Sequence, residues 1–321
     1  MDAPFHAGEI AVQMRVGVHE RMAEVGSRVM RTAMPEQHRE LFQKLPMMLV
    51  GSLDAHGRPW ASMVVGAPGF IHAPDDRHLR LNTTPLPGDP LADHLAVDVP
   101  LGLLGIEPHT RRRNRMNGTV EQMDASGFTV VVDQSFGNCP QYIQARQPSW
   151  VDAEGPPPVR LSPALHQEAL ALIRHSDTLF IATASARPQG HAGAQGVDVS
   201  HRGGPPGFVR IDVNPATSRT TLTLPDYRGN FMFNTLGNIA ANPRAGLFFF
   251  DPSTGDVLQA TGSAAIVWDE AQIAAFPGAQ RLLQVHIDEA LWRAGTLPLR
   301  WTAAQYAPQF EAMGISTELG A

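Results

Sequence analysis

The chain of 321 residues is long enough for two domains of ordinary size, and 43% of its residues are hydrophobic, which is ample for a buried core. A formal net charge of -6 argues against nucleic acid as the main partner, and the single cysteine, Cys139, excludes an intrachain disulfide. The first residues lack a basic start and an apolar core, and the longest apolar runs are too short for a bilayer, so we expect no signal peptide, no membrane partner and a cytoplasmic protein.

The first half of the chain is predicted to begin with a helical lead-in. An apolar strand, "MMLVGSL" at residues 47–53, follows it, and a hairpin is expected around the basic run at 111–115. The Pro-rich stretch "DAEGPPPVRLSP" at 152–163 is interpreted as a linker. Beyond it, Ser162 as N-cap and Pro163 at the first helical position predict a helix that continues to Ile173.

The second half continues with a series of strands. The run at 281–288 alternates cleanly, with Leu283, Val285 and Ile287 against polar neighbours, and "DPSTGD" at 251–256 is a turn signal between two strands. The other predicted strands are "TLFIATAS" at 178–185, "GFVRIDV" at 207–213, "TTLTL" at 220–224, "AGLFFFD" at 245–251 and "VLQATGSAAIVW" at 257–268. A helix plus about six antiparallel strands predicts a small barrel.

Three pairs of segments recur in the same order in both halves. Residues 101–120 can be laid over 245–264 without a gap, "GAPGF" at 66–70 matches "GPPGF" at 204–208, and "PEQHRE" at 35–40 matches "PALHQE" at 163–168. This order predicts an internal duplication, with copy one at about 30–150 inside a first domain of residues 1–150, and copy two at 160–321. Two fused copies are equivalent to a homodimer made covalent.

The second copy resembles the pyridoxamine 5'-phosphate oxidase-like, FMN-binding split-barrel family. The matching segments are "FIATAS" at 180–185, "DVSHRGGPPGFVRI" at 198–211, "LPDYRGNFMFNTLGNIAANPRAGLFF" at 224–249 and "LQATGSAAI" at 258–266, with weaker matches at 111–118 and 138–146. In that family two barrels form a dimer with FMN at their interface. The resemblance implies a mainly β, α+β chain of two tandem split β-barrels that form an intrachain pseudo-dimer. It does not imply the vitamin B6 oxidase reaction.

The stretch "SHRGG" at 200–204 is the first candidate for holding the FMN phosphate. A phosphate prefers arginine forks, hydroxyls and free backbone N–H groups. Ser200, Arg202 and the amides of Gly203 and Gly204 could supply these, with His201 beside them as an acid, a base or a hydrogen-bond donor to the flavin. The alternative is an ordinary solvated turn.

The stretch "GNFMFNTLGN" at 229–238 is the second candidate. Its amides and hydroxyl suit ribityl hydroxyls and the polar edge of the flavin ring. Many relatives have an arginine directly after this Gly-Asn pair, whereas this chain has Phe231, which could pack on the flavin. The alternative is a helix start capped by Asn234. The predicted residues here are Asn230, Phe231, Asn234, Thr235 and Asn238.

Copy one is expected to contribute side chains across the barrel interface. On a strand Arg113 and Arg115 share a face, so this pair could reach the phosphate, although a solvated face is equally expected of a charge run. Asn138 and Gln141 follow the last strand of copy one. Between them Cys139 could be a reactive thiol or a small buried group. The histidines show no metal-ligand spacing, so no metal site is predicted.

These residues favour an FMN-dependent oxidoreductase with an unknown small substrate or electron donor, and a homodimer is possible. A flavin or haem carrier without turnover is the alternative, and a barrel that binds nothing is a third possibility. Copy one lacks both "SHRGG" and the asparagine series, which predicts one FMN per chain.

Overall fold

The computed structural model describes residues 4–185 and 196–316, which form two large antiparallel sheets with flanking helices. The strands of the first sheet are β1 (Met47–Leu53), β2 (Pro59–Val65), β3 (Ile71–His72), β4 (His78–Leu81), β5 (Pro100–Glu107), β6 (Arg112–Asp124) and β7 (Gly127–Gly137). Those of the second are β9 (Val159–Leu161), β10 (Thr178–Ala184), β11 (Val197–Gly203), β12 (Arg210–Val213), β13 (Thr220–Tyr227), β14 (Arg244–Phe250), β15 (Val257–Val267) and β16 (Ala279–Arg293).

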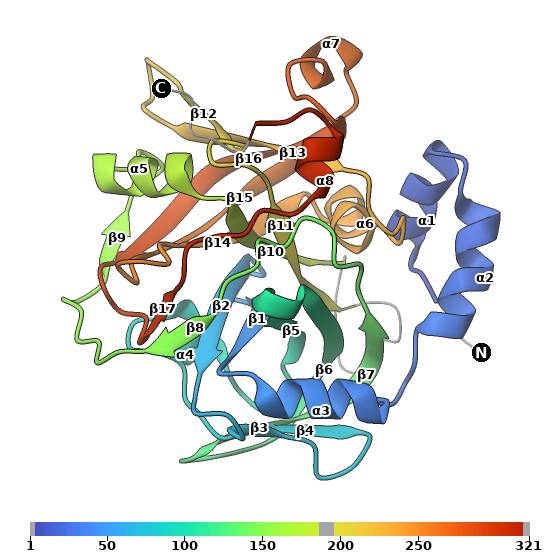
Figure 1. Cartoon of the computed structure of the whole chain (residues 1–321), viewed down its shortest axis with the longest axis vertical. Coiled ribbons are helices and arrows are strands. Elements are labelled where there is room, and N and C mark those ends of the chain that lie inside the picture. Colours follow the sequence, from blue (N-terminus) through green and yellow to red (C-terminus); the bar gives the residue numbers. More distant parts are fainter. Residues whose placement is uncertain (1–3, 186–195, 317–321) are drawn as a thin grey trace.

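The two sheets have the same strand order. The first is ordered β2-β1-β5-β6-β7-β4-β3 and the second β11-β10-β14-β15-β16-β13-β12, with β9 added beside β16. Figure 1 shows them as the lower and upper halves of the molecule. The predicted mainly β fold with two tandem barrels is confirmed.

The strand pairing reproduces the sequence match between residues 101–118 and 245–262. Leu101 pairs with Gly118 across β5 and β6, and Ala245 pairs with Gly262 across β14 and β15. A bulge occurs at each of these glycines, between Asn117 and Gly118 and between Thr261 and Gly262. Bulges bend a strand at a defined position. The two copies therefore bend their long strands at the same place.

One of the three sequence matches is out of register in the structure. The helix α3 (Glu36–Lys44) precedes β1 by the same spacing with which α5 (Gln167–His175) precedes β10, so Glu36 is equivalent to Gln167. The match of 35–40 with 163–168 is displaced by three residues. The predicted cap was also wrong, because His166, not Ser162, caps α5 by accepting from the Ala169 N–H. The prediction that residues 152–163 form a linker was wrong in part, because residues 159–161 form β9 and pair with β16.

The halves pack through reciprocal contacts, as a twofold relation requires. Gly102 on β5 lies against β11, where an added Cβ would be 2.6 Å from the Val197 carbonyl oxygen. Gly246 on β14 lies against β2 in the same way, 2.3 Å from the Pro59 carbonyl oxygen. Each half has its own apolar core, and a third cluster that includes Phe180 fills the interface between them.

The remaining elements connect the halves. The helices α1 (Ala7–Arg15) and α2 (His19–Val29) precede copy one. The helix α1 lies beside α6 (Asn234–Ala241) of copy two, and α2 lies on the outer side of α1 (Figure 1). Near the other end of the chain, β17 (Leu299–Trp301) pairs with β8 (Pro148–Trp150). Short helices complete the fold: α4 (Pro90–His94), η1 (Pro108–Thr110), α7 (Glu270–Ile273) and α8 (Gln309–Ala312). Within the described part of the chain, none of the helices is both long and apolar enough to cross a membrane.

Candidate functional site

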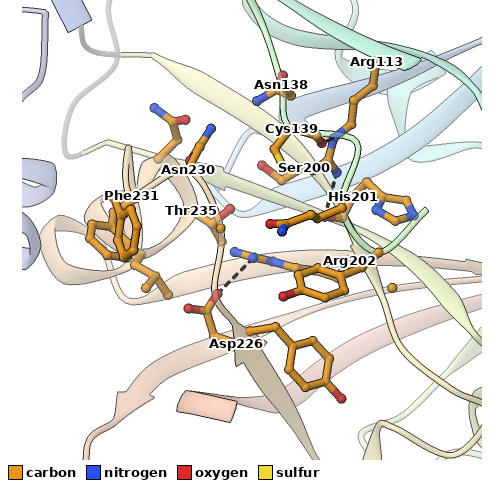
Figure 2. Close-up of a pocket in the computed structure, with 18 of the residues that line it drawn as sticks. Arg113, Asn138, Cys139, Ser200, His201, Arg202, Asp226, Asn230, Phe231 and Thr235 are labelled. Atoms are coloured by element: carbon orange, nitrogen blue, oxygen red, sulfur yellow. Dashed lines mark hydrogen bonds and ion pairs between the residues drawn. The ribbon is translucent and has the colours of Figure 1, made fainter. Parts of the chain in front are cut away.

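A pocket between the two halves collects nearly all of the predicted site residues. Copy one contributes β6 and the segment after β7, and copy two contributes β11, β13 and the start of α6. Figure 2 shows Arg113, Asn138 and Cys139 on one side, and Asn230 and Phe231 on another. The predicted residues that line this pocket are Arg113, Arg115, Asn138, Gln141, Ser200, His201, Arg202, Gly203, Asn230, Phe231, Asn234 and Thr235.

The stretch "SHRGG" lies largely on a strand, so the alternative of a solvated turn is wrong. Residues 197–203 form β11, which pairs with β10 along its whole length. The amide of Gly204 donates to the Asp177 carbonyl at 3.0 Å and is not free for a ligand. Gly203 is required for a different reason, because an added Cβ would lie 1.9 Å from the Tyr142 carbonyl oxygen. The two glycines allow close packing of the chain.

Arg115 is buried and held by β11. Its guanidinium lies 3.0 Å from the Asp198 carboxylate and donates to Ser200 Oγ and, at 3.1 Å, to the Val199 carbonyl. Asp198 also accepts from Asn117 at 2.7 Å. The charge of Arg115 is therefore matched within the protein, and this arginine positions Ser200.

Arg202 also has a carboxylate partner. Its Nη1 donates to Asp226 at 2.9 Å, an ion pair drawn in Figure 2, and Arg281 lies 3.2 Å from the other oxygen of Asp226. One nitrogen of the Arg202 guanidinium is thus already bound to a carboxylate of the protein. The sequence identified Arg202 without this partner, although Asp226 lies in the segment "LPDYR" that carries the resemblance.

Arg113 differs from its neighbours because it has no carboxylate partner among the described residues. Its Nε donates to the Cys139 carbonyl at 2.8 Å and its Nη1 to the His201 carbonyl at 3.5 Å. Burial, together with the positive charges of Arg115 and Arg202, lowers the pKa of Arg113 to about 9. A half-buried cation without a counter-charge favours the binding of an anion beside it.

Several other buried polar atoms of the pocket have no protein partner. They are both ring nitrogens of His201, Asn138 Oδ1 and Arg202 Nε. Burial and the nearby charges of Arg113 and Arg202 lower the pKa of His201 well below its usual value, so the imidazole is neutral. Buried polar groups usually have partners, and a cluster without them indicates a place where a polar ligand binds.

The opposite wall of the pocket is built from a strained loop. Phe231 has φ 61° and Phe233, the N-cap of α6, has φ 62°. Bulky residues rarely adopt this left-handed conformation, and such strain clusters at functional sites. Asn234 does not cap the helix, as the alternative proposed, but lies at its first position.

Of the asparagines in α6, Asn234 lines the pocket and Asn238 packs behind it. Asn234 lines the pocket and also donates to the carboxyl of Glu9 on α1. Asn238 is not among the lining residues, because it donates to Thr183 Oγ1 at 3.1 Å and its carbonyl oxygen meets His6 Nε2 at 2.9 Å. The contact of Asn238 with a cofactor stays a prediction, and in the structure its amide helps to hold α1.

The sequence missed the contribution of α1. Glu9 is 3% exposed, and burial and the Asp198 charge raise its pKa to about 8, so the carboxyl is protonated at neutral pH. One acidic residue in a lead-in carries no signal that it will be buried. Tyr142 and Tyr227 were missed as well, although each stands next to a predicted site segment.

The twofold-related position in the other half has different chemistry. Gln259 takes the place of Arg115 and donates to the Ala61 carbonyl at 2.9 Å and to Ser62 Oγ at 3.2 Å, the counterparts of Val199 and Ser200. Arg293, fully buried, takes the place of Asn138 and binds Asp89 at 2.9 Å. The arginine charge at this position is neutralised inside the protein.

The family assignment rests on a comparison of the whole sequence. The sequence model of the family described as "Pyridoxamine 5'-phosphate oxidase" matches residues 34–154 and again 165–314. The chain belongs to this family. The tandem match agrees with the two sheets of equal strand order. No curated protein matches the chain.

Solved structures of the family match one part of the chain at a time. HupZ of Group A Streptococcus is 16% identical over 39% of this chain and 90% of its own, with a TM-score of 0.29. A putative pyridoxamine 5'-phosphate oxidase from Lactobacillus delbrueckii is 16% identical over 40% and 94%, with a TM-score of 0.30. A related FMN-binding protein from Nostoc punctiforme is 12% identical over 45% and 98%, with a TM-score of 0.27. Scores this low carry no argument about function.

Proposed function

We propose that the chain binds one FMN in the pocket between its halves and acts as an FMN-dependent oxidoreductase on a small substrate or electron donor. The observation that carries the proposal is Arg113, a half-buried guanidinium in the pocket without a carboxylate partner among the described residues. A dianionic phosphate would supply the missing counter-charge. Arg113 replaces Arg202 as the main phosphate ligand because Asp226 already binds Arg202.

The other lining residues fit the rest of the cofactor. Ser200 can donate its hydroxyl proton while Oγ accepts from Arg115. Asn138 and the neutral His201 hold unpaired polar atoms that suit the ribityl hydroxyls or the polar edge of the flavin. Phe231 supplies an aromatic side chain on the opposite wall. The flavin supplies the electron transfer, and the protein residues bind and orient it.

His201 is suited to hydrogen bonding rather than to proton delivery. Its pKa lies well below the usual value, so at neutral pH the ring carries no extra proton to give. The proposal therefore assigns His201 as a positioning residue, and we assign no catalytic acid.

The absorption spectrum of the purified chain, with and without added FMN, tests the proposal. We expect bound flavin bands, FMN affinity above that of riboflavin, and bleaching by a chemical reductant followed by reoxidation in air. Absence of saturable FMN binding to the apo chain would contradict the proposal.

A haem carrier is the second candidate, and His201 is the observation that favours it. A buried imidazole with both nitrogens unpaired can serve as an axial iron ligand. Titration with haemin distinguishes the two, since a Soret band lost in His201→Ala, together with no flavin binding, supports the carrier.

A further inference from the structure

A second cavity lies directly beside the proposed cofactor pocket. It is open to solvent and has a volume of about 330 Å³, within the usual range for small-molecule sites. Pro225 and Tyr227 on β13 line both this cavity and the first pocket, so the two are separated by one layer of side chains. A molecule in the second cavity would therefore lie next to a ligand in the first.

One wall of this cavity exists in copy two alone. In copy one, β6 and β7 are joined by a turn of residues 125–126. In copy two, the equivalent strands β15 and β16 are joined by residues 268–278, which include α7 and place Phe276 and Pro277 against the cavity. The insertion thus belongs to the copy that carries β11, β13 and α6 of the first pocket.

The lining of the cavity has a definite chemistry. Prolines and aromatic residues predominate in it, with Pro205, Pro206, Phe208, Tyr227, Phe276 and Pro277 as its main members. Such surfaces prefer a planar apolar group over a flexible polar one.

Arg210 on β12 is the charged residue of the lining. Its guanidinium lies 4.9 Å from the centre of the Phe276 ring, which places the cation at the cavity. Its partner Asp212 is exposed and 3.3 Å away, and an ion pair of this kind is weak in water. A carboxylate on a ligand could share or replace Asp212. Copy one has His72 at the position equivalent to Arg210.

We propose that this second cavity binds a small planar aromatic carboxylate, with its ring between Phe276 and the proline faces and its carboxylate on Arg210. The assignment of this cavity as a substrate subsite rests on the proposed function, because the cavity would hold the substrate beside the flavin. The binding itself does not depend on the flavin.

Calorimetric titration of 2-naphthoate and the neutral 2-naphthamide into the full chain, with and without FMN, tests the subsite. We expect both probes to bind, and 2-naphthoate to bind without displacing FMN. Arg210→Met keeps the aliphatic stem and removes the charge, so it should weaken 2-naphthoate by about ten-fold and leave 2-naphthamide nearly unchanged. Phe276→Ala should weaken both probes.

The matched control is Arg77→Met, which removes an exposed arginine from copy one that lines neither pocket. It should change neither affinity. Weakening of 2-naphthoate by Arg113→Met instead of Arg210→Met, or displacement of FMN by the probe, would place the carboxylate in the first pocket and overturn the inference. Intact FMN binding without any probe binding also overturns it. Arg210-dependent probe binding without FMN binding supports the cavity and contradicts the proposed function.

Discussion

Three arginines line the pocket between the halves, and their surroundings determine which of them can bind an anion. Arg115 is matched by Asp198 and Arg202 by Asp226, whereas Arg113 donates to backbone carbonyls alone. A hydrogen bond to a charged group contributes about 1.5–3 kcal/mol when formed in a protein. All three residues are arginines, but they differ in whether a carboxylate of the protein already balances the positive charge.

Replacement of Arg113 by methionine tests this difference. Arg113→Met should weaken FMN about ten- to a hundred-fold, because a charged hydrogen bond to the phosphate is lost. Riboflavin, which lacks the phosphate, should change little, and titration of both ligands into the apo chain measures the two effects. Arg202→Met is the comparison: it should lower the melting temperature of the apo chain, since Asp226 loses a partner. Equal losses for FMN and riboflavin in Arg113→Met would contradict the phosphate role.

Glu9 makes the stability of the chain depend on pH. Its folded pKa is raised to about 8, so the folded state keeps a proton that the unfolded chain has lost above its usual carboxyl pKa. Stability should therefore fall as pH rises toward 8, by at most about 1.4 kcal/mol per pH unit. His6, His38 and His201 have lowered pKa values, so the unfolded chain binds protons there that the folded chain does not, and their opposite effect on stability fades by about pH 7.5.

Urea unfolding of the wild type and of Glu9→Gln between about pH 7 and 8.5, where the histidines contribute little, measures this effect. The wild-type free energy of unfolding should decrease over the window, and the variant, which has no proton to lose, should show a flatter dependence. Parallel curves for the two proteins would show that Glu9 is ionised in the folded state.

At the scale of elements, the contact between α1 and α6 forms the support behind one wall of the pocket. Gly8 and Gly237 bring the helices together so closely that a Cβ on Gly237 would lie 2.6 Å from the backbone of Glu9. His6 and Glu9 then bond Asn238 and Asn234. The lead-in of copy one is thus a structural part of copy two.

Gly237→Ala should separate α1 from α6. We expect a lower melting temperature, faster amide exchange over residues 7–15, and weaker FMN binding because Asn234 loses its support. Gly137→Ala is the control, since the nearest atom to its added Cβ is 3.8 Å away. Unchanged exchange in α1 would show that the helix contact tolerates the methyl group.

At the scale of the whole molecule, a nearly symmetric frame holds two unlike interface sites. The strands repeat with equal order and equal bulges, yet Arg113 and Arg115 are replaced by Val257 and Gln259 at the related position. There Asp89 and Arg293, 1% and 0% exposed, form an ion pair inside the protein. A buried ion pair of this kind leaves no free charge for a phosphate.

The asymmetry predicts one FMN per chain. Heat release of the flavin from saturated protein, quantified against the chain concentration, should give a ratio near one. A ratio near two in the wild type would show that the second position also binds the cofactor.

Asp89→Ala should destabilise the chain strongly, because it leaves Arg293 buried without a counter-charge.

Local features of this protein can be predicted from its sequence. Alternation of Leu283, Val285 and Ile287 gave β16 its buried face, and the strand at 47–53 lies where it was expected, because side-chain period and β-branched content are local properties. The repeated glycines at 118 and 262 and the segments that resemble the family identified the duplication and most of the pocket residues. The domain boundaries at 150 and 160 stay a prediction.

Which of these residues are free to bind a ligand depends on how distant segments pack together. Asp226 reaches Arg202 from another strand, Glu9 reaches Asn234 from the far end of the chain, and "SHRGG" becomes a strand because β10 pairs with it. None of these contacts has a local sequence signal, because each depends on how distant segments approach one another when the two halves pack. Charge balance is a property of that packing, and for this reason Arg113, rather than Arg202, is the arginine left without a partner in the protein.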